Sequence, residues 1–256
     1  MLKIRIIPIL LWNGSTLAKG QNFINEKRSA GSPLPTIKIY NSRDVDEIIF
    51  FNISNNTYDR NYFDFVEEIT DCVNVPITIG GGITNIDQMD QLFKSGADKI
   101  SINSIIYSNP KIIDDSSKKF GSQAITVSID VKKINNTYKC FSNNGKKVTD
   151  KKFVNYIKEC ADRGAGEIII NSIEHDGLME GYDNELIKLA SSIVKIPIVA
   201  AGGAGNSEHF YQAYNFGANA LAASSVFHFT VLTPANIKRY LEQKKIPIRK
   251  NFNLET

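Results

Sequence analysis

The sequence predicts an α/β protein folded as one (β/α)8 TIM barrel with a twofold half-barrel repeat. The chain has 256 residues, 42% of them hydrophobic and 22% charged. This size and composition are ordinary for a single-domain barrel. Two patterns favour that fold: short β-rich runs alternate with amphipathic stretches, and two long segments resemble each other.

Eight β-rich segments are expected to form the barrel strands, because branched apolar residues dominate them. They are Lys3–Leu11, Glu47–Ile53, Ile77–Gly80, Lys99–Asn103, Ala124–Asp130, Glu167–Ser172, Ile196–Ala201 and Ala218–Ala223. Between them, segments such as Asp87–Ser95 and Phe153–Arg163 carry apolar residues at helical spacing. This alternation predicts parallel βα units, and hence a doubly wound sheet or a closed barrel.

An internal repeat favours the barrel. ITIGGGITNIDQMDQLFKSGADKISINSI begins at Ile77, and IVAAGGAGNSEHFYQAYNFGANALAASSV begins at Ile198. Gly81 therefore matches Gly202, and the DEIIFFNI run before the first segment resembles the GEIIINSI run before the second. Two similar four-stranded halves are typical of a (β/α)8 barrel. Since no linker interrupts them, we expect one domain over residues 1–256.

The composition argues against several classes of function. The 30 basic and 27 acidic side chains leave a formal charge of +3, too weak to predict a nucleic-acid partner. No signal peptide or membrane span is recognisable, and the three cysteines form no CxxC pair, so we expect a cytoplasmic protein. No cofactor or metal is assigned, because the histidines lack metal-ligand spacing; they are His175, His209 and His228.

Small residues stand where four of the expected strands end. Gly80–Gly82 and Asn103–Ser104 do so in the first half, and Gly202–Gly203 and Ser224–Ser225 in the second. Glycines let backbone N–H groups approach an anion, although they also simply shape tight turns. Two symmetric copies favour phosphate binding, and they predict a small molecule with two phosphate-like ends.

Several blocks then carry a family resemblance. RII…AKGQNF, GADKISIN, FGSQAITVSIDVKK, RGAGEIIINSIEHDG and AAGGAGNSEHF resemble HisF, the cyclase subunit of imidazole glycerol phosphate synthase. The resemblance implies a barrel that docks a HisH-like glutaminase on its bottom face and conducts ammonia through its core. It further implies that, at the top, ammonia cleaves and cyclises a bis-phosphorylated formimino-aminoimidazole carboxamide ribonucleotide.

The resemblance also implies roles for individual residues. Those expected to bind phosphate are Gly82, Asn103 and Ser104 at one end, and Asp176, Gly177, Gly203 and Ser225 at the other. Lys19 and Asp130 match catalytic residues of the family. The expected ammonia gate consists of Arg5, Glu47, Lys99 and Glu167, with Asp98 beside the surface that contacts the glutaminase.

The sequence differs from the family at the first catalytic aspartate. The first catalytic aspartate falls on Leu11 and a further aspartate on Asn52, while Asn171 and Leu178 replace threonines. The cyclase reaction needs both a general acid and a general base, and leucine can act as neither. We therefore expect impaired cyclase activity. Trp12 replaces a small side chain, and it either fills substrate space or packs in the core.

Three functions stay open at this level. The leading hypothesis is an ammonia-conducting subunit of a glutamine-dependent amidotransferase. HisF-like and HisH-like pairs are associated with a sugar amidotransferase that makes acetamidino sugars for surface glycans such as the O-antigen of lipopolysaccharide. The alternative is a working cyclase of histidine biosynthesis that has recruited Asp176 or Glu174 as its acid. A third is a scaffold that only activates the glutaminase.

Overall fold

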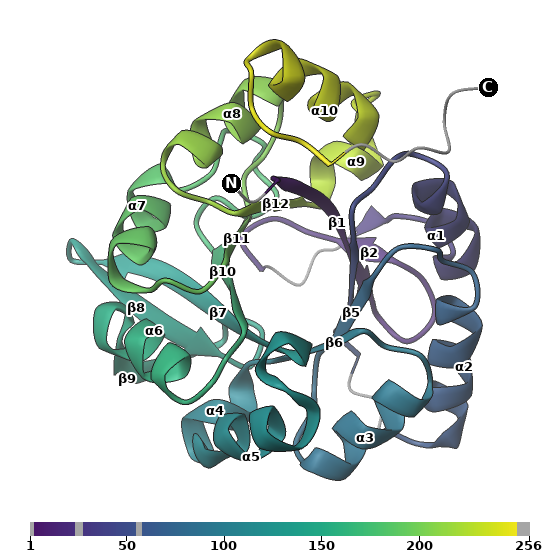
Figure 1. Ribbon diagram of the computed structural model, residues 1–256, viewed down its shortest axis with the longest axis vertical. Helices are drawn as coiled ribbons and strands as arrows, with labels where there is room; N and C mark the ends of the chain where they lie inside the picture. Colours follow the sequence, from purple (N-terminus) through teal and green to yellow (C-terminus); the bar gives the residue numbers. More distant parts are fainter. Residues whose placement is uncertain (1–2, 24–27, 55–57, 250–256) are drawn as a thin grey trace.

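The structure, a computed structural model, describes residues 3–23, 28–54 and 58–249. Eight parallel strands close into a barrel, and helices surround it (Figure 1). In order around the barrel the strands are β1 (Arg5–Trp12), β4 (Ile48–Asn52), β5 (Ile77–Gly80), β6 (Lys99–Ile102), β7 (Ile125–Ile134), β10 (Glu167–Ser172), β11 (Ile198–Ala201) and β12 (Ala220–Ala223). Pairing of β12 with β1 and of β7 with β10 completes the ring, so the predicted (β/α)8 barrel is confirmed.

The outer layer consists of short helices. They are α1 (Pro33–Asn41), α2 (Arg60–Thr70), α3 (Ile86–Lys94), α4 (Ser104–Ser108), α5 (Lys111–Phe120), α6 (Phe153–Asp162), α7 (Asn184–Ile193), α8 (Ser207–Asn215), α9 (Ser225–Phe229) and α10 (Pro234–Gln243), with a 3-10 turn at Ser122–Ala124. Polar caps begin several of them; the Asp183 carboxylate, for example, accepts the Leu186 N–H. Among the described residues, no helix has the length and apolar character that crossing a membrane requires.

Two hydrophobic clusters hold the barrel together. The larger one fills the space between the strands and the helices. The smaller one lies inside the barrel and contains Ile7, Ile9, Ile49, Ile169, Val199, Ala201, Ala220 and Ala222. Successive side chains of a strand point to opposite faces, so Ile6 joins the outer cluster and Ile7 the inner one.

The half-barrel repeat extends to individual hydrogen bonds. Asn85 caps α3 through its side chain, and Asn206 caps α8 in the same way. Asp98 accepts the N–H of the first residue of β5 at 2.8 Å, and Asn219 accepts that of β11 at 2.9 Å. Each pair is separated by the spacing found in the sequence repeat, so the two halves share their local structure as well as their strand order.

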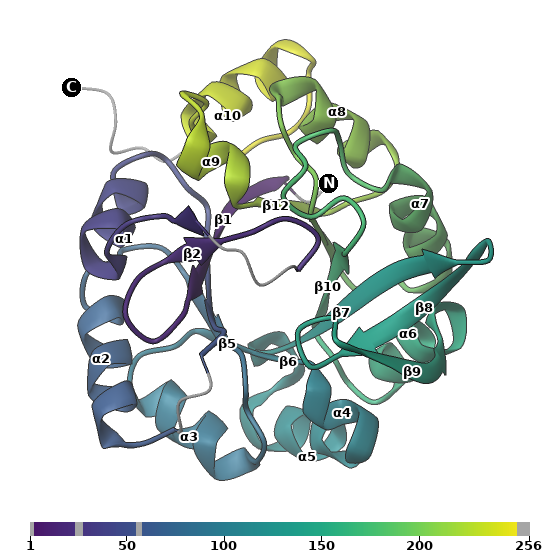
Figure 2. The same ribbon diagram turned by 180° about the vertical axis from the view of Figure 1, so that it is seen from behind.

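Within the described residues, four strands lie outside the predicted set. β2 (Ala18–Lys19) pairs with β3 (Arg28–Ser29) in the β1–α1 loop. β7 runs four residues beyond its predicted end and continues into an antiparallel hairpin with β8 (Thr137–Ser142) and β9 (Lys147–Lys152). Figure 2 shows both additions on one face of the barrel, in front of the strands. Prediction missed them because their sequences are polar and lysine-rich and lack the apolar runs of barrel strands.

Candidate functional site

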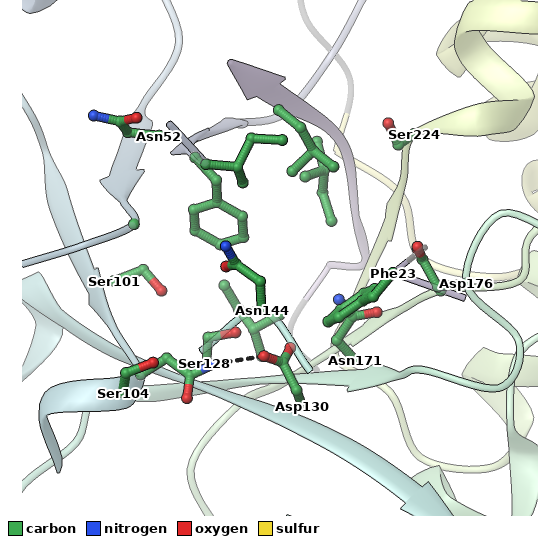
Figure 3. A pocket seen from close by; sticks show the side chains of 18 of the residues that line it. Phe23, Asn52, Ser101, Ser104, Ser128, Asp130, Asn144, Asn171, Asp176 and Ser224 are labelled. Carbon is green, nitrogen blue, oxygen red and sulfur yellow. Dashed lines mark hydrogen bonds between the residues drawn. The ribbon is translucent and has the colours of Figure 1, made fainter. Parts of the chain in front are cut away.

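A cavity of about 600 Å³ opens at the carboxyl ends of the barrel strands (Figure 3). The sequence-predicted residues that line it are Lys19, Gly82, Asn103, Ser104, Asp130, Asp176, Gly177, Gly203 and Ser225. The four predicted gate residues are not among its lining; they stand where strands begin, at the opposite end of the barrel. The predicted roles therefore divide between two ends of one barrel.

Asp130 is the carboxyl group at the centre of the cavity. It is 6% exposed, and Asn103 Nδ2 donates to its Oδ2 at 2.7 Å. Burial raises the pKa of Asp130 to about 7; the nearby Asp176 charge adds to this rise, while hydrogen bonds from Asn103 and Asn171 oppose it. A carboxyl group that titrates near neutral pH can both accept and donate a proton.

Leu11 and Asn52 supply no second acid. Leu11 lies on β1 with its side chain lining the cavity, beside Phe51 of the paired strand β4. The Asn52 amide oxygen accepts the Ser54 N–H at 2.9 Å and the Ser54 hydroxyl at 2.6 Å, which ties the last residue of β4 to the β4–α2 loop. The position expected to carry the family's first acid is thus an apolar part of the cavity wall.

Trp12 belongs to the core. Its ring stacks on Tyr62 at 5.6 Å between centroids and lies 4.9 Å from Phe65, both on α2. It is 9% exposed and does not line the cavity. Of the two interpretations of Trp12, core packing is correct, because alternation along β1 turns Trp12 outward and Leu11 inward.

Lys19 and Asp176 form a buried ion pair over the cavity. Lys19 is 4% exposed, and its Nζ lies 2.6 and 2.5 Å from the two oxygens of Asp176. The Asn22 N–H also donates to the Asp176 carbonyl oxygen at 2.8 Å. Gly177 has φ +79, and a Cβ there would lie 2.4 Å from the Gly20 carbonyl oxygen. The β1–α1 loop is therefore fastened to the β10–α7 loop across the cavity mouth.

This arrangement bears on the two acids named as replacements. The Asp176 carboxylate is held in a buried ion pair with Lys19. The Glu174 carboxylate accepts the Lys133 N–H at 2.9 Å, and Glu174 does not line the cavity. Neither group faces Asp130 as a free acid.

The two predicted phosphate sites present unpaired backbone donors. Within the described part of the chain, the Gly82 and Gly203 N–H groups donate to no protein acceptor. Gly203 has φ +109, and a Cβ there would lie 2.0 Å from the Gly181 carbonyl oxygen, so the turn itself also demands glycine. In the first site, the Ser104 hydroxyl accepts the Asn143 N–H at 3.0 Å. Both turns can therefore point an N–H group at an anion.

At the opposite end of the barrel, the four predicted gate residues form one ion-pair ring. Arg5 contacts Glu47 at 2.7 Å and also binds Glu167. Lys99 contacts Glu47 at 2.9 Å and Glu167 at 3.1 Å. Burial lowers the pKa of Arg5, but the two carboxylates outweigh burial, so the pKa is raised. Burial raises the pKa of Glu167, but the two cations outweigh burial, so the pKa is lowered. Two cations and two anions thus alternate around the end of the barrel where the strands begin.

The histidines take part in local hydrogen bonds. His175 Nδ1 lies 2.9 Å from the Ser172 hydroxyl, and His228 Nδ1 lies 3.2 Å from the Tyr40 hydroxyl. The Gly205 N–H donates to His209 Nδ1. No group of three or more His, Cys, Asp or Glu side chains placed to hold a metal ion occurs in residues 3–23, 28–54 and 58–249.

Sequence reasoning missed several residues that line the cavity. They include Phe23 from the β1–α1 loop, Ser101 and Ser128 from β6 and β7, and Asn144 and Lys146 from the β8–β9 turn. The alternation of polar residues in ITVSID could have indicated the inward-facing serine. The turn residues could not have been found without the hairpin.

Comparisons with known proteins agree with this geometry. A family model described as histidine biosynthesis protein matches residues 5–233. The imidazole glycerol phosphate synthase subunit HisF of Bacteroides thetaiotaomicron is 42% identical over 251 residues, 97% of this chain and all of that relative. HisF of Natranaerobius thermophilus and of Chlorobaculum tepidum are 41% and 40% identical over the same shares of each chain. The chain therefore belongs to the histidine biosynthesis protein family and is HisF-like.

Proposed function

We propose that this chain conducts ammonia from a HisH-like glutaminase through its barrel, as one subunit of a glutamine-dependent amidotransferase. The observation that carries the proposal is the ion-pair ring of Arg5, Glu47, Lys99 and Glu167. Buried charges are costly unless they are paired, and here each cation contacts both carboxylates. Such a ring closes the barrel to water while leaving no isolated ion.

The barrel interior supports this proposal because one side of it is polar. Thr78 on β5 donates to Glu47 of the ring at 2.7 Å. Ser101 on β6 lies next to Thr126 on β7, and neither hydroxyl has a protein partner among the described residues. Ser128 follows two residues later on the same face, toward Asp130. Buried hydroxyls without partners can bind a small polar molecule on its way between the ring and the cavity.

Asp98 suits the docking surface of a glutaminase. It precedes β6 at the same end of the barrel as the ring, and it is exposed. We place the HisH-like partner there, as a heterodimer. The relatives bear the name of a synthase subunit, which agrees with an assembly.

The mouth is proposed to bind a phosphorylated small molecule. Among the described residues, the donors available there include the N–H groups of Gly82 and Gly203 and the exposed amine of Lys146. Because Leu11 leaves the cavity without a second acid, a separate acceptor enzyme is the proposed consumer of the ammonia. A sugar amidotransferase of surface-glycan synthesis is our candidate.

A second function is favoured by Asp130 itself. A carboxyl group with a pKa of about 7 can donate and accept protons in one cycle, so it can serve a cyclase that lacks the other aspartate. The relatives at 40–42% identity carry the name of imidazole glycerol phosphate synthase. On this alternative the chain is a working cyclase subunit of histidine biosynthesis.

The deciding experiment measures turnover of the histidine-pathway ribonucleotide by the chain reconstituted with its glutaminase. The conducting subunit should release ammonia from glutamine but form little imidazole product, even with saturating ammonium salts. Turnover comparable to that of an ordinary histidine-pathway enzyme would establish the second function. If the chain stimulates the glutaminase but closing its barrel entrance has no effect, it is a scaffold.

A further inference from the structure

The floor of the cavity has two unlike sides. Ser128 and Asp130 on β7, Asn171 on β10 and Asn103, which follows β6, form a polar side. Figure 3 shows Ser128, Asp130 and Asn171 along this side, with Asn52 on the far one. Asp130 lies beside Asn171 in the strand register and accepts the hydrogen bond from Asn103. The polar side is therefore built by β7, β10 and the residue that follows β6, whereas on the far side the Asn52 amide oxygen is already occupied by Ser54.

Leu11 and Phe51 form the apolar side. They are direct neighbours in the register of β1 and β4, and both line the cavity. The Phe51 ring lies over β5, where a Cβ on Gly80 would come within 2.9 Å of two ring carbons. Glycine at this point of β5 leaves the space that the ring occupies. Ile9, one inward position below Leu11, also lines the cavity.

This apolar side keeps part of its surface exposed among the residues that the structure describes. Leu11 and Phe51 are only partly buried, and they pack from above against the fully buried cluster inside the barrel. Their outer surface therefore faces the cavity. Apolar area that a ligand removes from water contributes to its affinity by about 25 cal/mol per Å².

From this arrangement, we propose that the cavity binds a ligand with an anionic group at each end and a hydrocarbon middle that lies on Leu11 and Phe51. The anionic ends would occupy the turns at Gly82 and Gly203, so the inference rests on the proposed phosphate sites. One edge of the ligand can be polar, where Asn103, Asp130 and Asn171 face it. A middle that is polar along both edges would leave its groups unpaired against Leu11 and Phe51.

The test uses two series of synthetic probes. The first consists of straight-chain alkanediol bisphosphates of about four to about twelve carbon atoms. The second has ethylene-glycol spacers of matched length between the two phosphates. Calorimetric titration of each series into the chain should show an affinity rising roughly fourfold per methylene, until the chain reaches both turns. The glycol series should gain little with length.

Two variants locate the effect. Leu11→Asn and Phe51→Ser should each lower the affinity for the best alkane probe by roughly tenfold, because apolar contact is lost. Their affinity for inorganic phosphate should not change. Val148→Ser is the control, since Val148 is apolar, 52% exposed and on the outer hairpin strand β9. Thermal unfolding and phosphate binding confirm that each variant is folded.

The possible outcomes test the hydrocarbon preference separately from the proposed phosphate sites. Equal affinities for the two series, together with binding of inorganic phosphate, would overturn the hydrocarbon preference and keep the phosphate sites. An alkane preference that survives both Leu11→Asn and Phe51→Ser would also overturn it, because the contact would lie elsewhere. If neither phosphate nor any bisphosphate binds, the proposed phosphate sites are wrong.

Discussion

Replacing Lys99 with alanine tests whether the ring at the barrel entrance is a gate. Lys99 Nζ lies 2.9 and 3.0 Å from the two oxygens of Glu47 and 3.1 Å from Glu167. Without this amine, Arg5 alone faces two carboxylates, and the ring changes from neutral to a net charge of −1. The same change opens a space at the entrance where the lysine stem was.

The size of the effect follows from the burial of the ring. Removing one partner of a buried ion pair costs about 3–5 kcal/mol, because it leaves an uncompensated charge. The Lys99 side chain is 19% exposed, whereas Glu47 is 3% exposed. Water can therefore screen part of the imbalance, and we expect the free energy of unfolding to fall by about 3 kcal/mol. Lys94→Ala is the matched control, since its pair with Asp90 lies at the surface, where water screens the two charges.

A double variant tests whether Lys99 and Glu167 act together in the ring. Glu167→Gln alone leaves two cations facing one carboxylate, whereas Lys99→Ala combined with Glu167→Gln restores one cation and one carboxylate. The combined loss of stability should be smaller than the sum of the two single losses by more than about 1 kcal/mol. Chemical denaturation of the four proteins measures this coupling. Additive losses would show that the ring does not act as a unit.

The functional assay uses the chain assembled with its glutaminase and the acceptor enzyme. It compares product formation from glutamine with product formation from added ammonium. Product formation from glutamine should fall several-fold in Lys99→Ala, because ammonia must enter through the damaged ring. Product formation from added ammonium should change much less, because ammonia can then reach the cavity from its open mouth. An equal fall with both sources, or none with either, would refute conduction through the barrel.

Further changes test the mouth. Leu11→Asp should raise cyclase activity with ammonium salts by about 10²–10⁴-fold if only the acid is missing, whereas Leu11→Asn should not; the assay is turnover of the ribonucleotide. Because Asp130 has a pKa of about 7 when folded and about 3.9 when unfolded, the folded chain holds the extra proton between those values. The free energy of unfolding, relative to Asp130→Asn, should therefore fall as the pH rises from about 4 to about 7, and denaturation at a series of pH values measures it. Lys19→Met should cost about 3 kcal/mol by leaving Asp176 buried without its cation, and adding Asp176→Asn should recover most of that loss. Finally, crystals grown in ample sulfate should hold an anion at both Gly82 and Gly203; two empty, accessible turns would count against the phosphate sites.

The barrel could be predicted from the sequence because its strands are buried on both faces and read as apolar runs. The bounds of β5 and β10 agree with the prediction, and the other strands differ by a few residues at their ends. The β8–β9 hairpin was missed because it is polar on its exposed face, and a strand of this kind is defined by its partner more than by its own composition.

The site could be predicted only in part. The sequence placed Asp130 and Leu11 at strand ends, and the structure shows that both line one cavity. Pairings between distant positions, such as Lys19 with Asp176, depend on how two loops meet and leave no local pattern in either segment. The sequence also left open whether the Trp12 side chain faces the cavity or the core, because neighbouring strands determine which residues of a strand point inward.

Trp12 is the one tryptophan of the sequence, so it can serve as an intrinsic fluorescent probe. Its indole is enclosed by Tyr62 and Phe65. Its backbone neighbour Leu11 faces the cavity, so one peptide bond joins the fluorophore to the cavity wall. Fluorescence excited at the red edge of aromatic absorption, where tyrosine absorbs little, therefore comes from Trp12 alone. Any change in emission wavelength or lifetime reports on the packing of β1 against α2, with no label attached to the protein.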